Sequence, residues 1–133
     1  MLIVDLKREI LTAMFVEYQK DIPNFNNVKR KFISAGLDKN EFNVAILKLD
    51  NEGYLNNVSY TKGGRNPFGI HSVDLDHTLL TGDTVKYLEG KLELELTDDN
   101  VQKSKNILYR FTEAGYERIE SILTKTIAEL IKS

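Results

Sequence analysis

The hydrophobic pattern of this chain changes from a helical repeat to a strand repeat at Gly53. Before Gly53, apolar residues recur at the three- and four-residue spacing of amphipathic helices. After it, short alternating runs lie between clusters of turn residues. This order predicts an α+β protein in which helices precede a β-hairpin. The chain has 133 residues, which suits one domain.

Three helices are predicted before the change, at about residues 2–20, 25–35 and 38–51. The first has apolar side chains on two sides, which indicates a helix held between two other bodies. Proline and glycine end helices, whereas Asn and Asp side chains cap their first turns. The residues expected to bound the three helices in this way are Pro23, Asn24, Gly36, Asp38 and Gly53.

Two strands are predicted after the change, YLNNVSY (54–60) and IHSVDLDHTLL (70–80). The segment between them, TKGGRNPFG, is rich in turn residues, so the two strands are expected to form a hairpin. Thr81 is then predicted to cap a short helix that Gly90 ends.

The C-terminal part is predicted as an additional hairpin followed by a helix. KLELELT (91–97) alternates strictly, and NILYRF (106–111) is the expected returning strand. A helix that continues from Tyr87 across Gly90 is the alternative. Thr112 is predicted to cap the last helix, whose apolar stripe is Ile119, Ile122, Leu123, Ile127 and Leu130.

Composition excludes several classes of protein. The absence of cysteine excludes a disulfide scaffold, a zinc ribbon and a thiol nucleophile. Charged residues interrupt the N-terminal apolar run, and no run approaches the roughly 18 apolar residues of a membrane span, so a cytoplasmic protein is expected. The net charge of −2 argues against bulk attraction to nucleic acid, and any basic surface must be local.

Three short helices followed by a two-stranded hairpin is the order of a winged helix-turn-helix. EFNVAILKLDNEGYLNNV (41–58) resembles the third helix and first wing strand of that superfamily, and LLTGDTVKYLEG (79–90) resembles the end of its wing. The pairing of these segments is similar to the YjcQ-like winged-helix proteins of Gram-positive bacteria and their phages. The resemblance implies a winged-helix domain at 1–90 and a C-terminal extension at 91–133.

A second segment also resembles the end of a wing, so the sequence leaves open where the wing ends. FTEAGYERIESIL (111–123) fits the general bacterial pattern, so the wing could end at Phe111 with residues 61–105 as an insertion. Spacing favours the first copy, because Gly53 and Thr81 are 28 residues apart, about the length of one hairpin.

The winged-helix resemblance implies double-stranded DNA as a partner. An Asn amide can bond adenine, Val or Leu can touch a thymine methyl, and Lys or Arg can bind phosphates. The residues of the third helix expected to contact bases are Asn40, Asn43, Val44, Leu47, Lys48 and Asn51. Those expected to contact phosphates, from the second helix and the wing tip, are Lys29, Arg30, Lys31, Lys62 and Arg65.

Each of these features also has a plainer interpretation. Three consecutive basic residues on a helix are often only a solvated face, and the glycines of the wing tip often only form a turn. Val44 and Leu47 could contact another protein instead of DNA. The two functions that remain open are therefore a transcriptional regulator that binds DNA and a protein-interaction module of phage or mobile-element origin.

No enzyme, cofactor or metal site is expected. His71, Asp74, Asp76 and His77 are spaced along a strand whose alternation puts the histidines and the aspartates on opposite faces, so they would not converge on one ion. TKGGRN lacks the spacing of a phosphate-binding P-loop, and no set of nucleophile, base and orienting residue can be assembled.

The C-terminal helix suggests a homodimer. Its stripe of Ile119, Leu123, Ile127 and Leu130, together with Leu11 and Phe15 of the first helix, could pair with a second copy across a two-fold axis. The same stripe could instead cover the core of its own chain.

Overall fold

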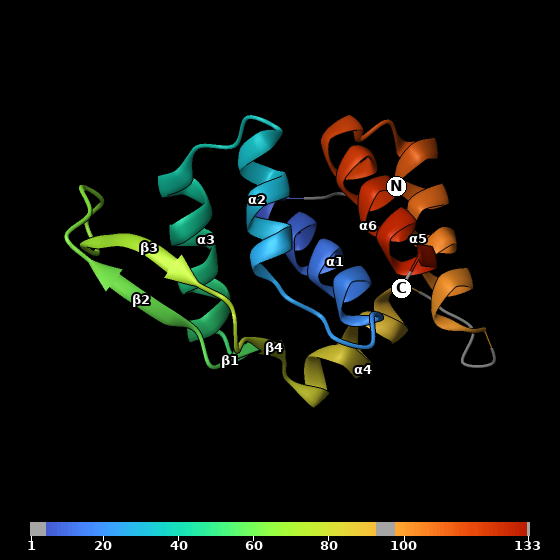
Figure 1. Cartoon of the computed structure of the whole chain (residues 1–133), viewed down its shortest axis with the longest axis horizontal. Helices are drawn as coiled ribbons and strands as arrows, with labels where there is room; N and C mark the ends of the chain where they lie inside the picture. Colours follow the sequence, from blue (N-terminus) through green and yellow to red (C-terminus); the bar gives the residue numbers. More distant parts are fainter. Residues whose placement is uncertain (1–4, 93–97, 133) are drawn as a thin grey trace.

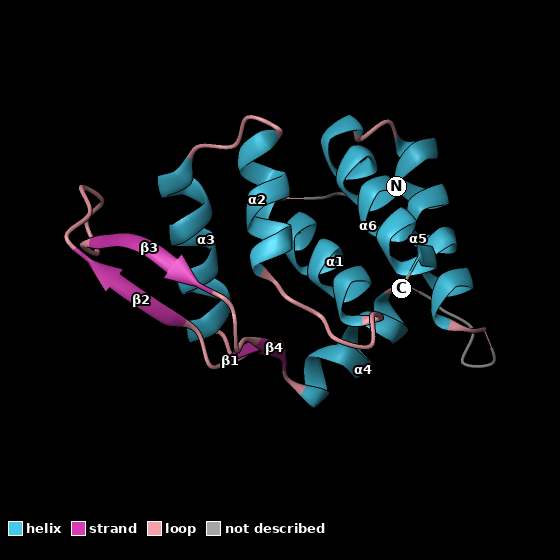
Figure 2. Ribbon diagram, viewed as in Figure 1, coloured by secondary structure: helices cyan, strands magenta, loops and turns pink. Residues whose placement is uncertain are grey.

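The predicted border between helices and strands at Gly53 is confirmed. The computed structural model describes residues 5–92 and 98–132 and has a mixed α+β fold. Its described part contains six helices and two small antiparallel sheets (Figures 1 and 2). The helices are α1 (Leu6–Tyr18), α2 (Asn26–Ser34), α3 (Lys39–Asn51), α4 (Gly82–Lys91), α5 (Asn100–Ala114) and α6 (Glu117–Lys132). The strands are β1 (Leu55–Asn56), β2 (Ser59–Lys62), β3 (Ile70–Asp74) and β4 (Leu79–Leu80).

Aspartate side chains cap α1 and α3, at Asp5 and Asp38. Asp38 caps α3 as predicted, since its Oδ2 accepts a hydrogen bond of 3.2 Å from the backbone N–H of Glu41. Asn24 is not the cap of α2, because the N-cap position is Phe25, which makes no side-chain cap hydrogen bond; Asn24 Oδ1 instead accepts from the backbone N–H of Asn26 at 2.9 Å, just before the helix. The helix ends just before Gly36, as expected.

Helix α1 occupies the centre of the fold. Every residue from Glu9 to Glu17 is buried, because α1 packs against α2 and α3 on one side and against α6 on the other (Figure 1). This arrangement confirms the prediction of a helix held between two bodies, which rested on its two apolar sides.

The predicted hairpin is present, and each of its two arms is split into two short strands. In the longer sheet, β2 pairs antiparallel with β3, with Ser59 opposite Asp74 and a register shift between Thr61 and Lys62. Nearer the helices, β1 pairs with β4. The β2–β3 hairpin lies beside α3 at the end of the molecule opposite α5 (Figure 1).

The helix after the hairpin begins as predicted but ends later. Thr81 caps α4, since its Oγ1 accepts from the backbone N–H of Thr84 at 3.2 Å. The expected end at Gly90 is wrong, because α4 continues through it to Lys91. The alternative helix across Gly90 is therefore observed as far as Lys91. Leu92 is the C-cap of α4, and residues 93–97 of the strand predicted at 91–97 lie outside the described residues.

The strand predicted at 106–111 is wrong, since these residues lie within α5. Its buried side chains, Ser104, Ile107 and Phe111, are three and four residues apart, which is the spacing of one helix face. Thr112 is not a cap either, because it lies in α5 and its Oγ1 donates to the carbonyl oxygen of Leu108. The final helix starts five residues later, at Glu117.

The apolar stripe of α6 faces the interior of its own chain. The four residues expected to form a dimer seam on this helix are at most 8% exposed, and α6 packs on α1 and α5. Leu11 and Phe15 of α1 are also buried. The surface predicted for dimerisation is thus part of the core, in agreement with the alternative that the stripe covers its own chain. These residues are Leu11, Phe15, Ile119, Leu123, Ile127 and Leu130.

Candidate nucleic-acid interface

One side of α3 is open to solvent. Asn40, Lys48 and Asn51 are exposed, and Val44 and Leu47 are half-buried. These positions fall within one arc of the helix at 100° per residue, opposite the buried face that includes Phe42, Ile46 and Leu49. The structure therefore brings five of the six residues expected to contact bases onto one accessible stripe.

The sixth residue, Asn43, does not reach solvent, and the expectation that it reads bases is wrong. Its side chain is fully buried. Nδ2 donates a hydrogen bond of 3.2 Å to the carbonyl oxygen of His71 in β3. Asn43 lies at the edge of the arc that faces the hairpin, so it joins α3 to β3.

A second contact fixes the hairpin against α3 near its C-terminal end. Tyr60 of β2 donates its hydroxyl to Asp50 Oδ2 at 2.6 Å. Burial and this acceptor together raise the pKa of Tyr60 well above its ordinary value. The hairpin is thus held along one edge of α3, and the exposed stripe lies next to it.

The tip of the hairpin is a closely hydrogen-bonded turn. Asn66 Oδ1 accepts from the backbone N–H groups of Phe68 and Ile70, at 3.0 and 3.2 Å, and its Nδ2 donates to the carbonyl oxygen of Ile70. A Cβ at Gly64 would lie 1.9 Å from that same oxygen, so only glycine fits there.

The tip carries basic and aromatic side chains on its outside. Lys62 and Arg65 are exposed, as expected for phosphate contacts. Phe68 is 53% exposed and was not singled out from the sequence. A lone aromatic between Pro67 and Gly69 is a feature that could have indicated it, since such a residue has no strand neighbours to bury it.

The basic cluster of α2 divides into internal and external residues. Lys29 Nζ donates to Ser72 Oγ at 3.1 Å and to the carbonyl oxygen of Val73 at 2.9 Å. Burial lowers the pKa of Lys29, and the charge of Lys39 lowers it further. Lys29 therefore ties α2 to the hairpin.

The other two basic residues of α2 differ in the same way. Lys31 Nζ lies 2.6 Å from Glu129 Oε1 and donates to Thr126 Oγ1, so it ties α2 to α6. Arg30 is exposed and contacts Asn27 within its own helix. Of the three residues expected to bind phosphates from α2, Arg30 is the one that is exposed.

The two aspartates of the 71–77 segment have structural partners. Asn26 Nδ2 donates to Asp74 Oδ1 and Asp76 Oδ1, at 3.2 and 2.7 Å. This contact lowers the pKa of Asp74, after the larger effect of the backbone N–H of Asp76. Among residues 5–92 and 98–132, no three His, Asp or Glu side chains gather in a way that could hold a metal ion.

None of the helices in the described part of the chain combines the length and apolarity needed to cross a bilayer. Comparison of the chain with protein-family models, with curated proteins and with solved structures found no match.

Proposed function

We propose that this chain is a winged helix-turn-helix protein that binds double-stranded DNA and regulates transcription in a bacterium or phage. Helix α3 enters the major groove, and the tip of the β2–β3 hairpin contacts the neighbouring backbone or minor groove. The observation that carries the proposal is the position of the hairpin along one edge of α3, beside the exposed stripe. A role at the chromosome places its site of action in the cytoplasm.

The exposed chemistry supports this mode of binding. Asn40 and Asn51 present amides that can pair with adenine, and the half-buried Val44 can touch a thymine methyl. Lys62 and Arg65 make no ion pair with the described residues, so their charges are free to meet phosphates.

Two acidic side chains near α3 already have partners. Glu52 pairs with Lys7 at 2.8 Å, and Asp50 accepts from Tyr60. The ion pair with Lys7 offsets the charge of Glu52, whereas the hydrogen bond from Tyr60 orients Asp50 without removing its charge. Steering by the whole molecule remains weak at a net charge of −2, so affinity is expected to depend on the few basic residues at the tip and on Arg30.

Fluorescence anisotropy with a random-sequence duplex tests the proposal. Binding should occur at low salt and weaken as salt rises, with a slope that reports the number of neutralised phosphates. The double variant Lys62→Ala/Arg65→Ala should weaken binding and make the logarithmic salt slope shallower by about 1.8, at about 0.9 for each lost phosphate contact.

The matched control is Lys86→Ala/Lys105→Ala, which removes two exposed charges from α4 and α5, far from the hairpin. It should bind DNA like the unaltered protein. Equal losses in the two double variants, or no binding at the lowest salt, would reject the proposed interface. The second outcome would favour the protein-interaction function, since the half-buried Val44 and Leu47 would then face a protein.

A further inference from the structure

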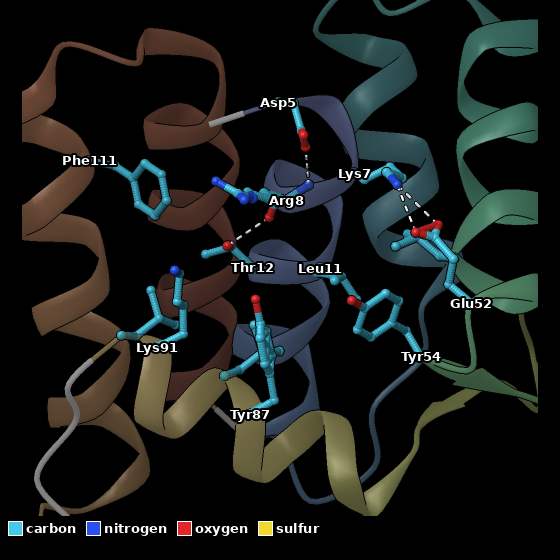
Figure 3. Close-up of a pocket in the computed structure, with 13 residues that line it drawn as sticks. Asp5, Lys7, Arg8, Leu11, Thr12, Glu52, Tyr54, Tyr87, Lys91 and Phe111 are labelled. Carbon is cyan, nitrogen blue, oxygen red and sulfur yellow. Dashed lines mark hydrogen bonds and ion pairs between the residues drawn. The ribbon is translucent and has the colours of Figure 1, made fainter. Parts of the chain in front are cut away.

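A cavity of about 200 Å³ lies on the side of α1 that faces α4. Its walls come from α1, the C-terminal end of α3, α4 and α5 (Figure 3). The cavity is separate from the exposed stripe of α3 and from the hairpin tip, and the proposed contacts with DNA do not use it.

Most of the cavity wall is apolar and aromatic. The rings of Tyr54 and Tyr87 lie 6.3 Å apart at an interplanar angle of 42°, and Phe111 closes the wall on the α5 side. Aromatic side chains in tilted arrangements favour a further ring in contact with them. An apolar cavity of about 150 Å³ is enough to hold benzene, a known example from another protein. The volume here therefore suits one ring with a small substituent.

The polar part of the wall favours a negative charge. Among the described residues, the charged side chains that line the cavity are Lys7, Arg8 and Lys91, with Asp5 and Glu52. Both carboxylates are already engaged, since Asp5 Oδ1 accepts from the backbone N–H of Arg8 and Glu52 binds Lys7.

Lys91 is the cation placed to meet a ligand. It makes no ion pair with residues 5–92 or 98–132. Its side chain rises from the end of α4 into the space near Thr12, beside Tyr87 (Figure 3). An anionic group at this point would face the ammonium, while the apolar body of the ligand would lie against the rings.

We infer that this cavity is a binding site for a small aromatic carboxylate with a single ring. The aromatic wall and the volume select the ring, and the ammonium of Lys91 selects the carboxylate.

The cavity also touches the junction between α3 and the hairpin. Leu49 and Glu52 belong to the end of α3, and Tyr54 directly precedes β1. The carbonyl oxygen of Tyr54 accepts from the backbone N–H of Thr81 and from Thr84 Oγ1, at the start of α4. A ligand here would therefore change the affinity of α3 for DNA. This coupling, unlike the binding itself, rests on the proposed function.

Benzoate is the probe, and benzamide is its neutral control of similar size. Titration followed by NMR should show benzoate shifting the resonances of Tyr54, Tyr87 and Phe111, with tighter binding than benzamide. Lys91→Met keeps most of the side-chain stem and should weaken benzoate about tenfold, as for the loss of one charge-assisted contact, while leaving benzamide unchanged. Lys86→Met, an exposed residue of the same helix outside the cavity, should bind both probes normally.

Tyr87→Ala provides a second variant that should remain folded, since Tyr87 is 43% exposed. It should weaken both probes. Absence of these shifts, or equal affinity of benzoate for the Lys91→Met and Lys86→Met variants, would overturn the site. If the protein binds benzoate but shows no DNA binding at any salt concentration, the proposed function would be rejected and the benzoate site would stand. If the protein binds both DNA and benzoate, a DNA affinity that stays the same at saturating benzoate would overturn the coupling.

Discussion

Asn43 of α3 and His71 of β3 are joined by a hydrogen bond of 3.2 Å from the buried side-chain amide to the backbone carbonyl oxygen. The other end of the same amide, Oδ1, is buried without a hydrogen-bond partner in the described part of the chain. Burying the unpartnered Oδ1 costs free energy. The one hydrogen bond that the Asn43 side chain makes is to β3, so it depends on the position of the hairpin.

Asn43→Ala should lower the free energy of unfolding by about 0.5–1.5 kcal/mol, because the carbonyl oxygen of His71 loses its side-chain donor, while removal of the unpartnered Oδ1 offsets part of that loss. Urea unfolding monitored by circular dichroism measures the change. Asn40→Ala is the matched control on the exposed stripe of the same helix, and it should change stability by less than about 0.5 kcal/mol. Similar losses in both variants would show that the buried amide has no special role.

The role of Asn43 could not be predicted from the sequence because the helical repeat alone does not show what covers each edge. The repeat correctly separated the buried face of α3 from its open face. Asn43 lies on the border between them, and a polar side chain there suggested solvent. Only the packing of β3 along that border decides that the amide is buried.

A second prediction concerns the contact between α1 and α6. Arg118 donates to both carboxylate oxygens of the buried Glu9, at 2.6 and 3.2 Å, and its guanidinium lies 6.0 Å from the ring centroid of Phe32. Arg118→Lys should lower the free energy of unfolding by about 1–2 kcal/mol, because an ammonium cannot reproduce the two-pronged contact. This value is below that of a fully buried pair, since the Arg118 side chain is 37% exposed.

Chemical denaturation again gives the measurement. Glu117→Gln, at an exposed position one residue earlier, should have little effect on stability. If Arg118→Lys were as stable as the unaltered protein, the contact would act as a simple exposed ion pair.

The C-terminal third was the part least predictable from the sequence. Residues 106–111 include Ile107, Tyr109 and Phe111, whose β-propensity and alternation favour a strand in a short window. The helix becomes evident only when Ser104 is included, since a small polar residue there continues the buried face. Propensity in a short segment was overridden by packing against α6.

The turn between α5 and α6 leads to a third prediction. Gly115 has a φ of +80° and its N–H donates to the carbonyl oxygens of Phe111 and Thr112. Gly115→Ala should lower the free energy of unfolding by about 1 kcal/mol through backbone strain alone, because a Cβ there meets no atom within 4 Å. Gly90→Ala, in the last turn of α4 and equally unobstructed, should raise it by about 0.5 kcal/mol.

The two alanine variants should therefore shift the melting temperature in opposite directions. Thermal unfolding measured side by side provides the check. A gain in stability at Gly115 would contradict the left-handed end of α5, and a loss at Gly90 would contradict the continuation of α4 through that residue.

The last prediction is a pH dependence at the contact between α6 and α2. Glu129 Oε1 lies 2.8 Å from Lys20 Nζ and 2.6 Å from Lys31 Nζ. Burial acts to raise the pKa of Glu129, but the hydrogen bonds from the two lysines outweigh it, and the pKa lies below its ordinary value of 4.5. A carboxylate whose pKa is lowered by folding stabilises the protein above the unfolded-state pKa, and this contribution is lost as the pH falls through the folded-state pKa.

Glu129→Gln should therefore lower the free energy of unfolding at pH 7 by about 0.2–1 kcal/mol, the range for pairs this exposed, since the Glu129 side chain is 47% exposed. The difference from the unaltered protein should shrink as the pH falls below about 4.5, and it should also shrink with added salt. Asp21→Asn, at an exposed position near the end of α1, should show neither trend. Urea unfolding from pH 3 to pH 7 gives the curves, and a constant difference across that range would mean that Glu129 stabilises α6 by packing and not by its charge.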